Sequence, residues 1–153
     1  MPDWAEQDVL NMLAALMQAE SAAREGEVPV GAVVVVDGKV IATGRNSSIF
    51  DSDPSGHAEM IALRAAAKAL NNYRLPEATL YVTLEPCIMC VGVIAQARLR
   101  RVVFGAYDSK AGALGSATDL TDSKALNHRF EINGGLLAEE SGTLLRDFFA
   151  ARR

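Results

Sequence analysis

Two short segments of the sequence combine residue types that bind a metal ion. Cys87 and Cys90 are the only cysteines and stand three positions apart, directly after Pro86. Side chains three positions apart on a helix share a face, and the positive end of a helix favours the thiolate, which is the form that binds metal. His57 offers an imidazole nitrogen, the other donor that tetrahedral zinc prefers. The sequence therefore predicts a zinc site formed by His57, Cys87 and Cys90.

The number of ligands decides whether such a site is catalytic or structural. Three protein ligands leave a position for water, whereas four close the site. His128 could supply a fourth ligand, but it lies 71 positions from His57, and local zinc modules keep their histidines close together. A redox pair of cysteines, or cysteines that share no role with the histidine, are the other interpretations. The proline before the cysteines and the histidine–alanine–glutamate segment upstream favour the metal site.

Glu59 is the candidate general base. On a regular helix, side chains two positions apart point in nearly opposite directions, so His57 and Glu59 should not bind one ion side by side. At an irregular helix start both can still reach the site. Glu59 would then lie beside the metal-bound water and could take its proton. The other interpretation is a first-turn carboxylate that only stabilises the helix dipole.

The hydrophobic pattern predicts the elements that must position these residues. Helices are expected over 3–24, 57–70, 87–97 and 138–152, and strands over 30–36, 39–42, 78–84, 101–105 and 130–132. Asp3 is expected to cap the first helix, with Glu6 three residues on. The Asp37–Gly38 pair predicts a tight hairpin, and residues 106–128 a long functional loop. This order indicates one α/β domain over residues 1–153, with a mixed sheet and helices on both faces.

Composition limits the function classes. Half of the residues are hydrophobic and 22% are charged, as in a globular protein. The sequence has no apolar run of membrane-spanning length and no signal-peptide pattern, so we expect a cytoplasmic protein. The net charge of −4 does not indicate a nucleic-acid binder. Residues 1–97 contain 6 basic and 12 acidic residues (−6), whereas residues 98–153 contain 9 basic and 7 acidic residues (+2). An ordinary solvated surface or a local phosphate-binding face would each explain this difference.

The chain also resembles a known family. The HAE segment at 57–59 followed by PCxxC at 86–90 is similar to the signature of the cytidine/deoxycytidylate deaminase superfamily. The similarity to bacterial tRNA-specific adenosine deaminases is wider and covers about residues 4–153. It includes EVPVGA at 27–32, NYRL at 72–75, ATLYVTLEPC at 78–87, RVVFGA at 101–106, Asp108, Lys110, GA at 112–113, GS at 115–116 and NHR at 127–129.

The resemblance implies a three-layer, cytidine-deaminase-like fold and a role for each matching residue. His57, Cys87 and Cys90 match the zinc ligands, and Glu59 matches a proton shuttle. Three more positions match the substrate site of the family. Asn46 matches a polar residue that holds the flipped nucleoside, and the backbone of Ala58 lies where the family contacts the base. Asp108 lies in a loop that contacts the anticodon in this family. The resemblance further implies a homodimer that acts on the anticodon stem-loop of tRNA.

The sequence departs from the expected pattern at Ser48, Gly56, Val91 and Gln96. None of these is a predicted ligand, so they concern the RNA context more than the chemistry. Two rival functions stay open. One is a deaminase of free guanine, cytosine or cytidine, which would not need the 106–129 segment for RNA. The other is a zinc-stabilised RNA-binding protein without activity, for which Glu59 would be dispensable.

Overall fold

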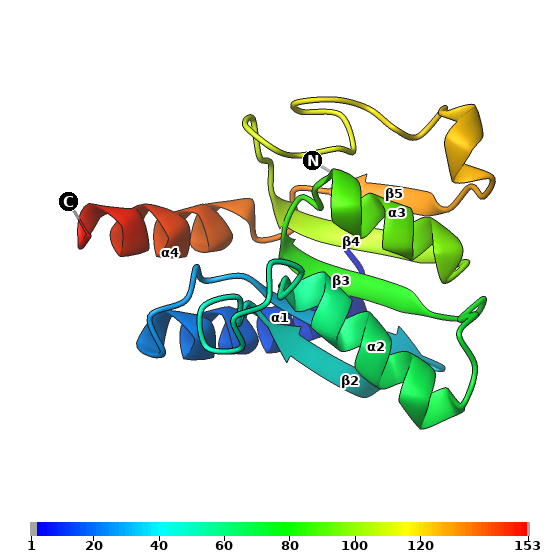
Figure 1. Cartoon of the computed structure of the whole chain (residues 1–153), viewed down its shortest axis with the longest axis horizontal. Helices are drawn as coiled ribbons and strands as arrows, with labels where there is room; N and C mark the ends of the chain where they lie inside the picture. Colours follow the sequence, from blue (N-terminus) through cyan, green and yellow to red (C-terminus); the bar gives the residue numbers. More distant parts are fainter. Residues whose placement is uncertain (1–2, 153) are drawn as a thin grey trace.

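The computed structural model describes residues 3–152, which form a five-stranded sheet with helices on both faces, as predicted. The strands are β1 (Gly31–Val36), β2 (Lys39–Arg45), β3 (Thr79–Leu84), β4 (Arg101–Ala106) and β5 (Glu131–Gly134). The helices are α1 (Glu6–Arg24), α2 (Ala58–Leu70), α3 (Ile88–Gln96) and α4 (Ala138–Ala150), with a short 3₁₀ helix, η1 (Lys124–Leu126), in the long loop. Figure 1 shows α2 and α3 in front of the sheet and α1 behind it. No helix among these residues has the length and apolar character needed to cross a membrane.

The sheet is mixed, in the order β2-β1-β3-β4-β5. The predicted hairpin joins β1 and β2 in antiparallel pairing, and its two turn residues, Asp37 and Gly38, have φ values of 52° and 74°. Such positive values suit a two-residue hairpin turn. Strand β1 is also antiparallel to β3, whereas β3, β4 and β5 run parallel to one another. Because parallel strands end at the same edge of a sheet, the loops that follow β3 and β4 start side by side.

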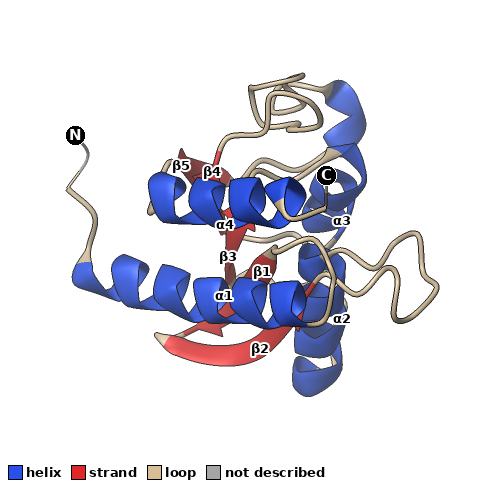
Figure 2. Cartoon of the chain, turned by 90° about the vertical axis from the view of Figure 1, so that its left-hand side faces the viewer, coloured by secondary structure: helices blue, strands red, loops and turns tan. Residues whose placement is uncertain are grey.

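The run of valines in β1 is buried on both faces, which explains why it is apolar at every position. Ala32 and Val34 belong to the core beneath α2 and α3, while Val33 and Val35 pack with Met12 of α1 on the opposite face. Successive side chains of a strand point to opposite faces, so one continuous apolar strand supplies both cores. Figure 2 shows α1 and α4 together on one side of the sheet.

Two predicted boundaries were wrong. Helix α1 begins at Glu6, with Ala5 as its extended N-cap residue and no side-chain cap, so Asp3 does not cap it. Strand β2 continues to Arg45, three residues beyond the predicted end of the strand at residue 42. Gly44 can extend the strand there because it lies directly against α2: a Cβ on Gly44 would come within 2.4 Å of the Ala58 carbonyl oxygen. This close approach places the end of β2 beside the start of α2.

A candidate metal centre and the loops around it

The starts of α2 and α3 bring the three predicted ligands together. His57 is the N-cap residue of α2 and Cys87 is the N-cap residue of α3, both with extended backbone. The Nδ1 atom of His57 lies 3.6 Å from the Cys87 sulfur and 3.5 Å from the Cys90 sulfur. The three ligand atoms lie within 4.8 Å of one another. The ring nitrogen of His57 that faces both sulfurs is Nδ1.

The spacing of these atoms fits tetrahedral zinc. Bonds of about 2.0 Å to nitrogen and about 2.3 Å to sulfur, at the tetrahedral angle, separate two ligand atoms by about 3.6 Å. The nitrogen–sulfur distances in the structure are 3.6 and 3.5 Å. Zinc binds well to thiolate sulfur and imidazole nitrogen, whereas magnesium and calcium prefer oxygen ligands. The donor types and both nitrogen–sulfur distances therefore fit a zinc ion.

The electrostatics of the cluster favour one thiolate before any ion is present. A hydrogen bond from the Cys90 thiol, followed by one from His57, lowers the pKa of Cys87 to about 3. The same contact with Cys87, together with burial, raises the pKa of Cys90. His57 has a raised pKa because it pairs with the Cys87 sulfur, although partial burial opposes the shift. A positive ion would add to the stabilisation of negative charge on both sulfurs.

Glu59 reaches the same cluster from the first turn of α2. Glu59 is only 4% exposed, and His57, Cys87 and Cys90 are the neighbouring groups that act on its pKa. Burial raises the pKa of Glu59 to about 7, well above the usual value of a carboxyl group. The extended backbone of His57 removes the angular conflict that a regular helix would impose on residues 57 and 59. A carboxyl group with this pKa can both accept and donate a proton near neutral pH.

His128 does not complete a fourth corner of this cluster. Its Nε2 atom lies 2.8 Å from the carbonyl oxygen of Leu99, which follows the C-terminal end of α3, whereas Cys87 lies at the opposite end of that helix. Among the residues that the structure describes, the group that could hold a metal contains only His57, Cys87 and Cys90. The closed structural site with His128 is therefore not formed. Both cysteines are free thiols, so the structure contains no disulfide at this position.

Asn46 and Ala58 lie next to one another and connect β2 to the site. The Oδ1 atom of Asn46 accepts a hydrogen bond of 2.8 Å from the backbone N–H of Ala58, one of the N–H groups at the start of α2. The backbone N–H of Asn46 donates to the Val30 carbonyl. Asn46 therefore fixes the start of the helix that carries His57 and Glu59. Its side-chain NH₂ group is the part of Asn46 that could donate to a ligand.

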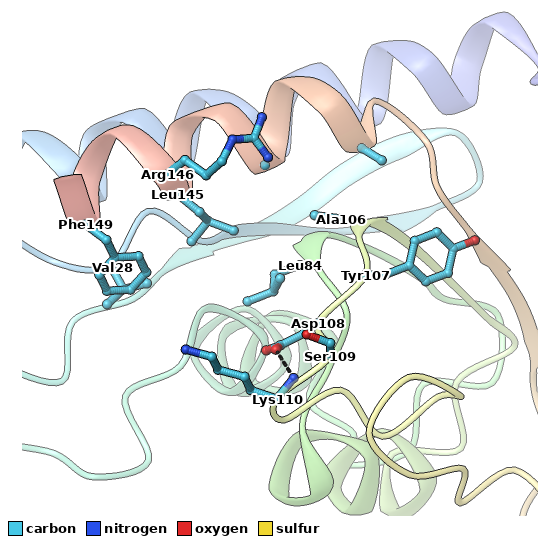
Figure 3. A pocket seen from close by; sticks show the side chains of 12 residues that line it. Val28, Leu84, Ala106, Tyr107, Asp108, Ser109, Lys110, Leu145, Arg146 and Phe149 are labelled. Carbon is cyan, nitrogen blue, oxygen red and sulfur yellow. Dashed lines mark hydrogen bonds between the residues drawn. The ribbon is translucent and has the colours of Figure 1, made fainter.

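Asp108 follows β4 and shapes the beginning of the long loop. Its Oδ1 atom accepts hydrogen bonds from the backbone N–H groups of Lys110 and Ala111, which closes a tight turn. The turn borders a cavity of about 680 Å³ between this loop and α4. Figure 3 shows Asp108 and Lys110 on one side of the cavity, and Arg146 and Phe149 of α4 on the other. The cavity thus combines charged groups of both signs with an exposed aromatic ring.

Two buried glutamates that the sequence analysis missed hold the loops on either side of the site. Glu27, 3% exposed, accepts hydrogen bonds from the backbone N–H groups of Ile49 and Phe50. Glu85, 2% exposed, accepts from four donors in the 108–116 segment. The available signal was the position of Glu85 at the end of an apolar strand, where an unpaired charge is not expected to be buried.

Comparison with known proteins decides the family. A profile of the MafB19-like deaminase family matches residues 6–153. The tRNA-specific adenosine deaminase of Haemophilus influenzae is 51% identical over 150 residues, which cover 97% of this chain and 87% of that protein. The chain belongs to the tRNA-specific adenosine deaminase family.

The solved structures agree with this assignment. A structure from a study of A-to-I editing by tRNA:A34 deaminases at the wobble position has a TM-score of 0.87 and 43% identity, covering 89% of this chain and 99% of that one. A guanine deaminase from Nitrosomonas europaea has a TM-score of 0.81 at 23% identity, covering 98% and 87% of the two chains, and shows the shared fold alone. The cytidine-deaminase-like fold implied by the sequence is thus confirmed.

The four departures from the expected pattern of tRNA-specific adenosine deaminases lie in two places. Ser48 and Gly56 lie against one another: a Cβ on Gly56 would come within 3.0 Å of the Ser48 backbone. These two departures therefore lie in contact with one another in the loop that precedes His57. Val91 is fully buried in α3 directly after Cys90, whereas Gln96 is exposed at the end of that helix. Nothing in the structure explains the residue choice at Gln96.

Proposed function

We propose that this chain converts adenosine to inosine at the wobble position of a tRNA anticodon, with a zinc ion held by His57, Cys87 and Cys90. The observation that carries the proposal is the cluster itself: three ligand atoms within 4.8 Å of one another, with the buried carboxyl of Glu59 near enough to His57 and both cysteines for them to affect its pKa. Three protein ligands are what a catalytic zinc site requires. Membership in a family of deaminases supplies the reaction class.

The reaction adds one water to C6 of adenine and releases one ammonia. A bound zinc ion lowers the pKa of a coordinated water to about 7, which supplies the nucleophile at neutral pH. Glu59 would accept one proton from the attacking water and transfer it to the purine ring nitrogen. It would then take the remaining proton, from the hydroxyl group added at C6, and pass it to the amino group, which leaves C6 as ammonia. One carboxyl group can perform both directions of transfer because its pKa of about 7 lies near the working pH.

The substrate would be held by groups on both sides of Glu59. Because Glu59 is buried, an adenine base that stays in the nucleic-acid stack could not reach it, so the nucleotide would be flipped out. The NH₂ group of Asn46 and the backbone at Ala58 are the proposed contacts to the flipped nucleoside. The loop that begins at Asp108 is the proposed contact to the anticodon. We further propose that the enzyme is a single-domain homodimer in the cytoplasm.

The experiment that tests the proposal supplies possible substrates separately. Purified protein, with its zinc content measured, is incubated with an anticodon stem-loop carrying adenosine at the wobble position, and in parallel with free adenosine, guanine, cytosine and cytidine. Inosine in the stem-loop, and ammonia from the small molecules, are quantified. We expect turnover of the stem-loop alone. Fast ammonia release from a free base, with no inosine in the stem-loop, would replace this function with free-base deamination.

A further inference from the structure

The 108–116 loop is attached to the sheet through one buried carboxylate. The Oε1 atom of Glu85 accepts hydrogen bonds from the backbone N–H of Asp108 and from the Ser116 hydroxyl. Its Oε2 atom accepts from the backbone N–H groups of Leu114 and Ser116, at 3.0 and 3.1 Å. Four donors thus satisfy a carboxylate that is only 2% exposed, which is how an unpaired negative charge can be buried without a cationic partner.

The loop is wrapped closely around the segment that leads into the metal centre. The backbone N–H of Ala113 donates to the Pro86 carbonyl oxygen at 2.8 Å, and Pro86 directly precedes Cys87. Gly112 lies so near to Glu85 that a Cβ would come within 2.4 Å of the carboxyl carbon. The position of the loop is therefore set at the point where β3 ends and the cysteine-bearing segment begins.

The same attachment fixes one wall of the cavity beside α4. Tyr107, Asp108, Ser109 and Lys110 line that cavity, and Glu85 binds the backbone N–H in the middle of this run. Figure 3 shows the Asp108–Lys110 turn facing Arg146 and Phe149 across the cavity. If the turn moves, the distance between these two walls changes, while the three metal-binding side chains keep their own supports at the starts of α2 and α3.

We propose that Glu85 is a positioning residue that sets how tightly the enzyme binds RNA, by holding the 108–116 loop in its binding shape. This inference rests on the proposed function, because it assumes that the loop contacts the anticodon. A glutamate is needed because all four partners are donors. A glutamine would have one acceptor oxygen for two of them and would turn its NH₂ group toward the other two, so that at least one backbone N–H, that of Asp108, or else those of Leu114 and Ser116, loses its acceptor.

The two buried glutamates have separate tasks. Glu27 binds the N–H groups of Ile49 and Phe50, in the loop before His57, and makes no contact with the 108–116 loop in the hydrogen bonds that the structure gives. A variant of Glu85 should therefore loosen one loop and leave the other unchanged. Local opening of this kind is visible as faster exchange of backbone amide hydrogens.

The test compares Glu85→Gln with Glu77→Gln, a matched control at an exposed glutamate that pairs only with Arg100 at the surface. We expect Glu85→Gln to keep wild-type zinc content and to exchange the amides of residues 108–116 faster, while residues 47–51 keep their rates. For an anticodon stem-loop we expect KM and the dissociation constant Kd each to rise about tenfold, which is the cost of one charge-assisted hydrogen bond. We expect kcat to stay within about threefold of the wild-type value. Glu77→Gln should match wild type in every measurement.

The remaining outcomes distinguish this inference from its alternatives. Ser116→Ala removes one of the four donors without placing an amide beside the others, and should give a smaller rise in KM. A Glu85→Gln variant that loses zinc and thermal stability while KM stays at the wild-type value would show a purely structural role and overturn the inference. Unchanged loop exchange would do the same. If the wild-type enzyme binds the stem-loop but forms no inosine, the proposed function fails. The dissociation constants of wild type and Glu85→Gln for the stem-loop still test the role of Glu85.

Discussion

Replacement of Glu59 by glutamine separates the proton shuttle from every other role of this side chain. Glutamine has nearly the same size, so it should fill the site in which Glu59 is only 4% exposed. It cannot accept a proton from water or pass one to the purine. Because Glu59 is not among the three residues whose ligand atoms cluster, the variant should keep its zinc.

The expected loss follows from the number of transfers that the carboxyl performs. A positioned general acid or base contributes typically about 10²–10⁴-fold to a rate. Glu59 acts once as an acceptor and then as a donor, so the lower limits of the two roles combine to about 10⁴-fold. Burial raises the pKa of Glu59 well above the usual value of a carboxyl group, which suits a side chain that must both accept and donate a proton. We expect single-turnover inosine formation to fall about 10⁴-fold.

The assay measures inosine in an anticodon stem-loop under single-turnover conditions, with zinc content, Tm and stem-loop affinity measured on the same samples. Glu139→Gln is the matched control, because Glu139 is an exposed glutamate in the first turn of α4. The Glu139→Gln variant shows what is lost when a first-turn carboxylate only stabilises a helix dipole. That interaction contributes about 0.3–1 kcal/mol to the free energy of unfolding. Glu59→Asp should be intermediate, since it keeps the carboxyl but shortens its reach.

A Glu59→Gln variant that forms inosine within tenfold of the wild-type rate would refute this reasoning. It would mean that the proton leaves by another route and that the raised pKa reflects burial alone. A variant that loses zinc together with activity would also contradict it, since Glu59 would then support the metal rather than the chemistry.

Three further predictions follow from the geometry. Cys87→Ala should bind no zinc and lower Tm by about 5 °C or more; retained stoichiometric zinc would exclude the ligand set. Asn46→Asp keeps the acceptor for the Ala58 N–H and should keep Tm but lose activity about 10²-fold, whereas Asn46→Ala should lose both; activity near the wild-type level in Asn46→Asp would argue against substrate contact by the NH₂ group. Asp8 pairs with Arg101 at 2.9 Å, and these hydrogen bonds outweigh burial and hold the Asp8 pKa below its usual value. Asp8→Asn should cost about 2–3 kcal/mol in urea unfolding at pH 7. The contribution is present above the unfolded pKa of about 3.9 and is lost as pH falls through the lower native pKa, so that wild type and variant converge in acid.

Much of the fold could be predicted because local patterns encode it. The Asp37–Gly38 pair fixed the hairpin, since both residues tolerate the positive φ that its turn requires. The valine run of β1 indicated a strand buried on both faces. The end of β2 could not be predicted, because Gly44 belongs to the strand only through its contact with α2, whose first residue lies 14 positions further on. The start of α1 was also missed, because no side chain caps it.

The candidate site divides in the same way. The types and spacing of His57, Cys87 and Cys90 indicated their convergence, because few other patterns place these donors at two helix starts. Helical periodicity could not decide whether Glu59 reaches the cluster, and the extended backbone of His57 decided it. The burial of Glu85 was not predicted, because a glutamate is normally exposed and its position at the end of an apolar strand does not reveal the loop that supplies its donors.

By itself, the sequence determined which atoms were available for chemistry and how the backbone bends near each of them. It supplied a thiol pair, an imidazole and a carboxyl, with glycines and prolines at the turns that present them. Only the tertiary structure decided that Nδ1 of His57 faces the sulfurs, that His128 lies elsewhere, and that Glu27 and Glu85 each hold a loop. The physical reason is distance along the chain. Donors and acceptors separated by 22 to 33 residues meet only after the sheet has set the order of its strands.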